Sequence, residues 1–351
     1  MGEASSYNHL TIYRQPERYE YLASARAAAP FFDRITRAWI VADPDLCREL
    51  LSSPALDPAP AVEHYRNMPT GLGEQFQSVA FAFENIPLSM SGERHAEARR
   101  RAASFMASRH EAIHAWVEAE LPGLLAPLAW PGRVELMGEV IKPTVRGLFA
   151  ALVGVDLPKS LKLDQVSGVF DKSMSMTRRM ALEAEMAALE AHLRAQLADD
   201  VDLGMRLGLL VIGKDALVGT LAESLVQLFR DNAGAPLGSI PYPRMPQQTA
   251  VPFVERVAVA PVSVAGLELA PGDRVRLVLQ TYALSPASEH HRFFGAGAHA
   301  CLGRPLSLEL WTTIVSHLVR MRTRVSVLNY RLPRDSYVFN VATTFEIEVT
   351  E

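Results

Sequence analysis

The stretch that decides the fold lies near the end of the 351-residue chain and reads Phe294-Gly295-Ala296-Gly297-Ala298-His299-Ala300-Cys301-Leu302-Gly303. Its glycines let a backbone turn tightly and lie close to a flat group. Behind the loop, leucine and isoleucine recur every four residues from Leu302 to Leu318, which predicts a helix to about Met321. Pro305 suits the first turn of that helix. Cys301 is therefore expected at a helix N-terminus, where free N–H groups and the helix dipole favour a thiolate.

This segment resembles the cysteine-ligand loop of the cytochromes P-450, whose pattern is Phe, Gly, any residue, Gly, any residue, a basic residue, any residue, Cys, any residue, Gly. Every fixed position is filled, with His299 as the basic residue. A thiolate held in this way is what a haem iron with a sulfur ligand needs. The resemblance implies that Cys301 binds the iron of haem b and that Phe294, Gly295 and Gly303 contact the cofactor. The alternative is a buried structural cysteine in a glycine loop.

Composition and charge narrow the class of protein. A net charge of −4 gives no reason to expect nucleic-acid binding, and 49% hydrophobic residues indicate a globular protein with a sizeable core. Two cysteines, Cys47 and Cys301, make no disulfide framework, so a reducing cytoplasm is expected. Residues 1–20 are polar, and apolar runs such as 207–212 are too short to span a bilayer. We expect a protein of the cytoplasm without a membrane or nucleic-acid partner.

The pattern along the chain predicts a mainly α protein with a minor β portion. Helical periodicity predicts a short helix after Asp43-Pro44 and longer helices over about 92–128, 137–153, 163–200 and 201–230. Strands are expected at 38–41, within 253–284 and in the last thirty residues, whereas 55–90 reads as irregular. This mixture is that of the P-450 fold, which the resemblance places over 1–351 as one domain.

Further basic side chains follow the same resemblance. His95 and Arg99 stand four residues apart on a predicted helix, so both can reach one partner. The resemblance implies that these two residues, Arg256 and His299 bind the haem propionates, for which cationic donors are suited. The alternative for the helix is a solvated basic face.

The predicted helix over 201–230 departs from the P-450 pattern. The related motif is Ala, Gly, any residue, an acid, Thr, Thr or Ser. Gly213 and Asp215 match it, but Ala216 and Leu217 stand at the alcohol positions. In monooxygenases the acid and the alcohol relay protons during oxygen activation, which is general-acid work. Asp215 is thus a candidate catalytic residue with an atypical neighbour, and its alternative role is an ordinary polar pair with Lys214.

A second departure concerns the Glu-any-any-Arg helix that P-450 proteins carry shortly before a proline turn. The proline-rich stretch 239–246 stands there, with no glutamate and no room for a helix. The letters of Glu289 to Arg292 match but lie directly before the cysteine loop, so we interpret them as a chance match. The chain is expected to be trimmed before the cysteine-ligand loop.

Four hypotheses for the function follow. The first is a haem-thiolate monooxygenase that acts on a small organic biosynthetic intermediate, with a ferredoxin or flavodoxin as redox partner and atypical proton delivery. The second is a peroxide-using or non-oxygen-activating haem enzyme for dehydration, isomerisation or N–O chemistry. The third is a P-450-like auxiliary protein that activates a partner enzyme. The fourth is a zinc site made of His290, His291, His299 and Cys301, although their spacing is irregular for zinc.

Overall fold

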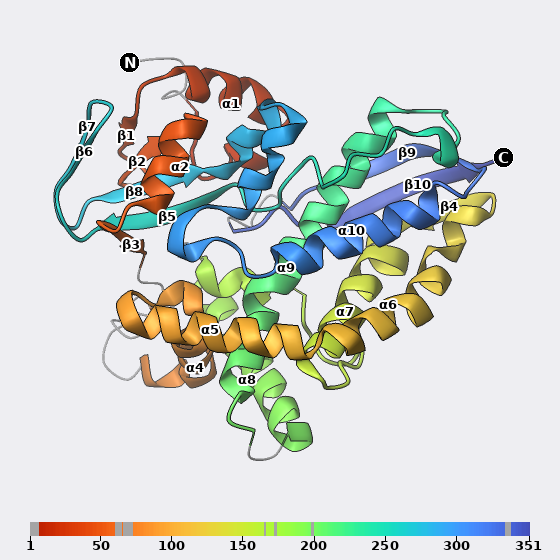
Figure 1. Ribbon diagram of the computed structural model, residues 1–351, viewed down its shortest axis with the longest axis horizontal. Coiled ribbons are helices and arrows are strands. Elements are labelled where there is room, and N and C mark those ends of the chain that lie inside the picture. Colours follow the sequence, from red (N-terminus) through yellow and green to blue (C-terminus); the bar gives the residue numbers. More distant parts are fainter. Residues whose placement is uncertain are drawn as a thin grey trace.

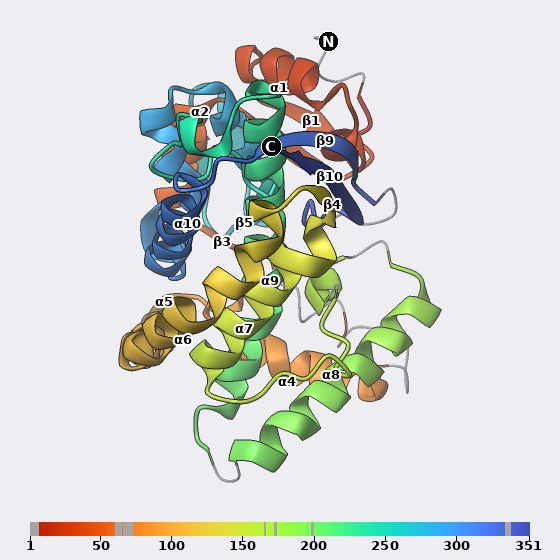
Figure 2. The same ribbon diagram turned by 90° about the vertical axis from the view of Figure 1, so that its right-hand side faces the viewer.

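A computed structural model describes residues 7–59, 65, 73–164, 166–171, 174–197, 200–333 and 338–351. In Figure 1 the strands and α1 and α2 occupy the upper half, and α4 to α8 lie below them. Figure 2 shows the same division from the side, with α9 passing from the helical half into the half that holds the sheets. The described residues are mainly helical with a smaller β part, as the sequence predicted.

The α-helices are α1 (Arg18–Ala27), α2 (Pro44–Ser52), α4 (Gln77–Asn85), α5 (Gly92–Ser108), α6 (His110–Leu125), α7 (Lys142–Val153), α8 (Met176–Leu197), α9 (Leu203–Asp231) and α10 (Arg304–Leu318). A π-helical turn, Met137–Ile141, leads into α7. In α2 the Asp43 side chain accepts from the Leu46 N–H at 2.8 Å, and Pro44 begins the helix. Such caps satisfy N–H groups that have no partner within the helix.

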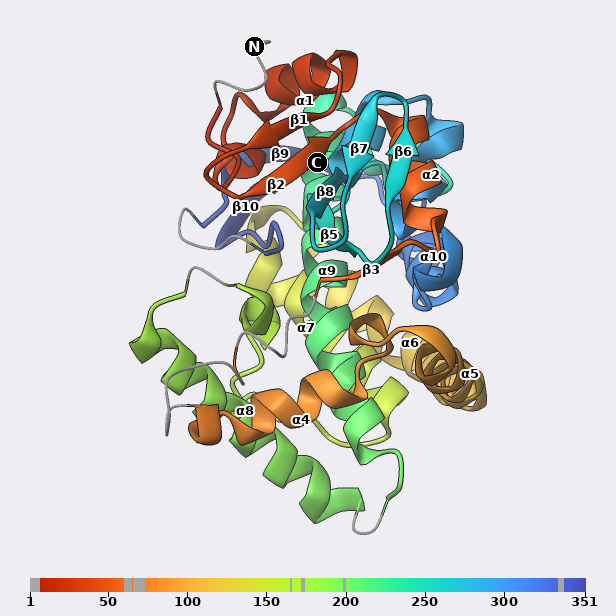
Figure 3. The ribbon, with the colours of Figure 1, turned by 90° about the vertical axis from the view of Figure 1, so that its left-hand side faces the viewer.

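The strands form three sheets. A five-stranded sheet has the order β1 (Phe31–Asp33), β2 (Ala38–Val41), β8 (Arg274–Val278), β5 (Phe253–Ala258) and β3 (Leu56–Pro58). A second sheet has the order β4 (Gly132–Glu135), β10 (Thr344–Thr350) and β9 (Arg324–Arg331). β6 (Val262–Val264) and β7 (Leu267–Leu269) make a hairpin that lies in front in Figure 3. The first sheet combines β1, β2 and β3 from the N-terminal part of the chain with β5 and β8 from its C-terminal part. β5 therefore pairs with β3, although about 200 residues of sequence separate the two strands.

Several predicted boundaries were wrong. The helix expected over 92–128 is two helices that meet at Arg109, and the helix expected over 163–200 is regular only over α8 in the described residues. Within the stretch expected to be irregular, 55–90, the structure forms α4. The apolar side chains of α4, Val79 and Phe83 among them, are buried against the main core, which also contains residues of α9. Tertiary packing thus overrides the weak local pattern there.

The longest helix, α9, runs through the middle of the molecule, and 20 of its 29 residues are buried. Its half-exposed positions in the central part recur every three or four residues, at Leu209, Ile212, Gly213, Ala216 and Thr220. That spacing places them on one side of a helix. We call this side the open face of α9, although its side chains are half-buried and Leu209 and Ile212 still pack against the main core.

The segment between α9 and β5 is short and contains no α-helix. Residues 232–252 have one 3-10 turn, Leu237–Ser239, and otherwise run as an extended, proline-rich chain. Trp311 of α10 donates to the Pro243 carbonyl at 2.9 Å. Thr220 and Ser224 of α9 accept from the N–H groups of Ala250 and Gln248 at 3.1 and 3.2 Å. These bonds hold the segment against α9 and α10, and the prediction that residues 239–246 form no α-helix is confirmed.

Candidate functional site

The cysteine loop is a tight turn in front of α10. The N–H of Cys301 donates to the carbonyl of Phe294 at 2.7 Å, which closes the loop on itself. Gly295 and Gly297 have φ angles of +74° and +68°, a region that favours glycine. A Cβ atom on Gly297 would lie 2.7 Å from the Leu51 carbonyl oxygen of α2. The glycine pattern therefore reflects both the turn and a close approach to α2.

Cys301 lies directly before α10, as expected, and is exposed. The protein atoms packed around its sulfur raise the pKa of the thiol. The N–H groups of Gly303 and Arg304 and the charge of Arg99 lower this pKa, but only in part. The helix N-terminus thus acts in the expected direction but is too weak by itself to produce a thiolate. A bound metal cation would supply the missing stabilisation, because coordination deprotonates a thiol.

Four basic side chains from three elements meet beside this loop. The rings of His95 on α5 and His299 in the loop stack with centroids 3.9 Å apart. Burial, with further contributions from His95, Arg256 and Arg99, lowers the pKa of His299 to about 4. Burial lowers the pKa of Arg256, on β5, to about 10. These residues therefore lie near one another, since His95, Arg256 and Arg99 all contribute to the pKa shift of His299.

These side chains fit a ligand that carries two carboxylates. His299 Nδ1 is buried and has no hydrogen-bond partner among the described residues. Neither Arg99 nor Arg256 forms a salt bridge with a carboxylate of the described part, and Asp57 offsets only some of the shift of Arg256. Arg256 Nη1 donates to the Glu255 carbonyl at 3.0 Å, but a neutral carbonyl does not balance the charge of a buried guanidinium. Together with the exposed sulfur, this donor set suits a haem, whose propionates would pair with the basic groups.

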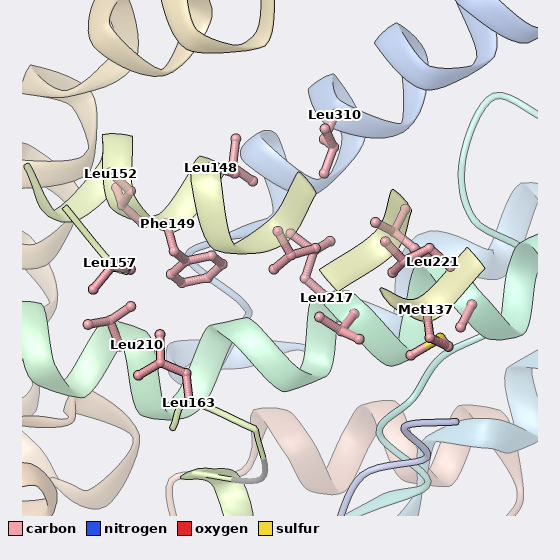
Figure 4. Close-up of a cluster of buried hydrophobic side chains, with 14 of the residues drawn as sticks. Met137, Leu148, Phe149, Leu152, Leu157, Leu163, Leu210, Leu217, Leu221 and Leu310 are labelled. Carbon is pink, nitrogen blue, oxygen red and sulfur yellow. The ribbon is translucent and has the colours of Figure 1, made fainter. Parts of the chain in front are cut away.

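The three candidate residues of α9 divide between its open face, which carries Gly213 and Ala216, and its buried side, which carries Asp215. Gly213 faces α7, because a Cβ atom there would lie 2.8 Å from Phe149 Cζ. Figure 4 shows Phe149 pointing from α7 toward α9. Ala216 lies on the open face of α9, whereas Asp215 is buried. Among the described residues, no hydrogen bond or ring contact links Gly213, Asp215 or Ala216 to the cysteine loop.

Asp215 belongs to a buried polar group that the sequence did not reveal. Ser167 donates to one carboxylate oxygen of Asp215 through its hydroxyl at 2.6 Å and through its N–H at 3.2 Å. Lys214 forms an ion pair with the other oxygen. Ser167 stands 48 residues upstream in a 3-10 turn, Val166–Phe170, so no spacing in the sequence could relate it to Asp215. The polar pair that Asp215 forms with Lys214 is thus present, and both of its side chains are buried.

The zinc hypothesis is not supported. The described residues contain no group of three or more His, Cys, Asp or Glu side chains placed to hold a metal ion. His290 and His291 instead bond to the carbonyls of Ser285 and Ser288 at 3.0 and 2.8 Å. Both belong to the 3-10 segment Ala287–Phe294 that precedes the cysteine loop.

Comparison with known proteins shows the fold. No family model matches the chain, and no curated protein sequence is similar to it. Solved structures are similar over nearly the whole length. P450BioI in complex with an acyl carrier protein ligated to hexadec-9Z-enoic acid has a TM-score of 0.75 at 14% identity, covering 95% of this chain and 98% of that one. The P-450 heme domain from Tepidiphilus thermophilus has a TM-score of 0.77 at 15% identity, covering 98% of this chain and 97% of that one.

Cytochrome P-450-153 from Novosphingobium aromaticivorans has a TM-score of 0.73 at 19% identity, covering 97% of this chain and 98% of that one. The chain therefore has the cytochrome P-450 fold, which the sequence predicted. Among the helices of the described part, none is long and apolar enough to cross a membrane.

Proposed function

We propose that this protein is a haem-thiolate oxidoreductase in which Cys301 binds the iron of haem b. The observation that carries the proposal is the exposed sulfur of Cys301 beside basic groups that lack a carboxylate partner in the described part. The propionates would bind His95, Arg99, Arg256 and His299, and Phe294, Gly295 and Gly303 would lie against the porphyrin. A haem with a thiolate ligand supplies oxygen activation, because the thiolate favours cleavage of the O–O bond.

The reaction that we propose is a monooxygenation of a small organic molecule, such as a biosynthetic intermediate. The open face of α9 supports an apolar substrate, since Leu209, Ile212 and Ala216 lie along it. Thr220 is the polar side chain among the half-exposed central positions, and its hydroxyl oxygen already accepts from Ala250. A ferredoxin or flavodoxin would supply electrons, and the two free cysteines fit a reducing cytoplasm.

Proton delivery would be atypical. Ala216 has a methyl group on the open face where an alcohol is expected, and a methyl group neither donates nor accepts a hydrogen bond. Asp215 is the nearest acid along the helix, and Ser167 is the hydroxyl that contacts it. We infer that the Ser167 hydroxyl and the Asp215 carboxylate to which it donates relay the proton for this step.

The test is product formation under three conditions: with NADPH and a ferredoxin system in air, with hydrogen peroxide alone, and anaerobically without reductant. A monooxygenase needs the first condition. Turnover in peroxide only, or under anaerobic conditions, would replace it with the second hypothesis, a peroxide-using or non-oxidative haem enzyme. The substrates to screen are small, mainly apolar organic molecules.

An auxiliary role is the second candidate, and the missing helix between α9 and β5 favours it. A protein that only activates a partner enzyme does not need a sulfur ligand or basic groups for propionates. The deciding experiment compares wild type with Cys301→Ser in a partner-activation assay. Equal activation would support the auxiliary role, and loss of activation together with loss of haem would reject it.

A further inference from the structure

The short helix α4 covers the N-terminal part of α9. Figure 3 shows α4 lying across α9, and its side chains Val79 and Phe83 are buried in the main core. Gly208 of α9 lets the two helices approach closely, because a Cβ atom there would lie 3.2 Å from the Asn85 carbonyl oxygen. The next residue of α9, Leu209, is the first residue of its open face. α4 therefore lies beside one end of that face.

The start of α4 has no cap of its own. Its N-cap residue is Phe76, which has no side-chain oxygen, so the first N–H groups of the helix need acceptors from elsewhere. The carboxylate of Glu183, on α8, accepts from the N–H of Ser78 at 2.8 Å and from the N–H of Val79 at 3.0 Å. These are the N–H groups that an N-cap side chain serves, and the negative charge suits the positive end of the helix dipole.

α4 depends on other helices for its stability. Isolated helices shorter than about 12–15 residues are marginal in water, and α4 has only nine residues. Side chains from two other helices hold its ends. Glu183 binds the first turn, and Arg94 of α5 donates to the Glu84 carbonyl at 3.2 Å near the last turn. A short helix held in this way opens at a lower free energy than the long helices around it.

We propose that α4 is a lid over α9 that opens as one unit, and that Glu183 of α8 is the latch that holds it closed. Opening breaks the hydrogen bonds at Ser78 and Val79 and uncovers α9 next to Leu209. The open lid would therefore admit small organic molecules to the open face of α9. That admission rests on the proposed function, whereas the lid itself does not.

The test of the lid is hydrogen–deuterium exchange of the full-length protein, measured by mass spectrometry on peptides from α4, α8 and α9. In the wild type, α4 should exchange at least about tenfold faster than the centre of α9. Glu183→Gln should speed the exchange of α4 about tenfold further, the effect of one charge-assisted hydrogen bond, and leave α9 unchanged. Glu185→Gln, two residues further along α8 and also half-buried, is the matched control and should leave α4 unchanged.

Unchanged exchange of α4 in Glu183→Gln would overturn the lid. Equal acceleration in α4 and α9 would overturn it as well, because it would mean that the whole protein unfolds. Admission is measured by stopped-flow binding of imidazole, whose nitrogen binds a ferric haem. Association should be about tenfold faster in Glu183→Gln than in the wild type and in Glu185→Gln.

The two measurements separate the lid from the proposed function. Equal association rates together with faster exchange of α4 would overturn the admission and leave the lid standing. A wild-type protein without haem would overturn the proposed function and the admission with it. The exchange of α4 would still decide whether Glu183 is a latch, because that measurement needs no cofactor.

Discussion

The cysteine loop and the centre of α9 differ in how closely they follow the P-450 pattern. In the loop every fixed position is filled, and the fold brings His95, Arg99 and Arg256 to it from α5 and β5. In α9 the alcohol is replaced by Ala216, and the acid turns toward Ser167. In the proposed enzyme, cofactor binding and proton delivery thus belong to separate parts of this chain, and one part departs from the pattern while the other follows it.

The first way to break this comparison is to remove the sulfur. Cys301→Ser should abolish the red-shifted Soret band that reduced haem-thiolate proteins show with carbon monoxide, because an alcohol does not replace the thiolate. The fold should remain, since Cys301 is exposed and serine differs from it by a single atom. The buried Cys47→Ser is the matched control and should keep the band. A wild-type protein that binds no haem would end the proposal.

The second prediction concerns α9. Asp215→Ala should reduce oxygen-dependent turnover by a factor of about 10² to 10⁴, the contribution of a positioned proton donor. Hydrogen peroxide should restore part of the turnover, because it brings its own protons. Ser167→Ala removes one contact of Asp215 and should cause a smaller loss.

Stability must be measured beside this turnover, because Asp215 is buried with Lys214. Removing one partner of a buried ion pair costs about 3–5 kcal/mol. The double variant Asp215→Ala/Lys214→Met leaves no unpaired charge and separates folding from catalysis. Full oxygen-dependent turnover in this double variant would show that Asp215 is structural only.

The third prediction sharpens the description of the loop. His95→Ala, Arg99→Ala and Arg256→Ala should each weaken haem retention by about one to two orders of magnitude, since a charge-assisted bond contributes about 1.5–3 kcal/mol. The measurement is the rate of haem transfer to an excess of apomyoglobin. Arg94→Ala, on the exposed side of α5, is the control. Unchanged transfer rates in all three variants would contradict the propionate assignment.

The fourth prediction compares two glycines of the loop. Both have a positive φ, and Gly295, with φ 74° and ψ −170°, lies in a backbone region that is almost restricted to glycine, so an alanine at either position carries strain of about 1–3 kcal/mol. Gly297→Ala adds a clash to this strain, because its Cβ would meet the Leu51 carbonyl at 2.7 Å while nothing lies within 4 Å of a Cβ on Gly295. Denaturant unfolding measures both losses, and a loss in Gly297→Ala that does not exceed about 1–3 kcal/mol would show that α2 yields without cost.

The smallest effect concerns pH. The folded, haem-free protein resists protonation of His299, whose pKa falls from 6.5 to about 4. The unfolded chain binds this proton, so the free energy of unfolding should decrease as the pH falls from about 6.5 to about 4. Above pH 6.5 the contribution of His299 to this free energy should be complete. His299→Asn should flatten this slope. Bound haem should flatten this slope too, because its propionates favour the protonated form of His299.

Much of this arrangement could be predicted from residue patterns. The ten-residue loop with its following helix, the helical positions of His95 and Arg99, and the lack of a helix over 239–246 are local features, because each depends on neighbours in the chain. The P-450 fold follows from them through the resemblance. The single domain over 1–351 and the roles of the site residues stay predictions.

Tertiary structure alone decided the rest. The sequence by itself determined which residue types stand at the loop, since a sulfur, glycines and basic groups are chemical identities. It did not determine that Asp215 accepts from Ser167 or that α4 is helical. These features depend on contacts between residues far apart in the chain. The free energy of such contacts comes from packing, so no local sequence pattern predicts them.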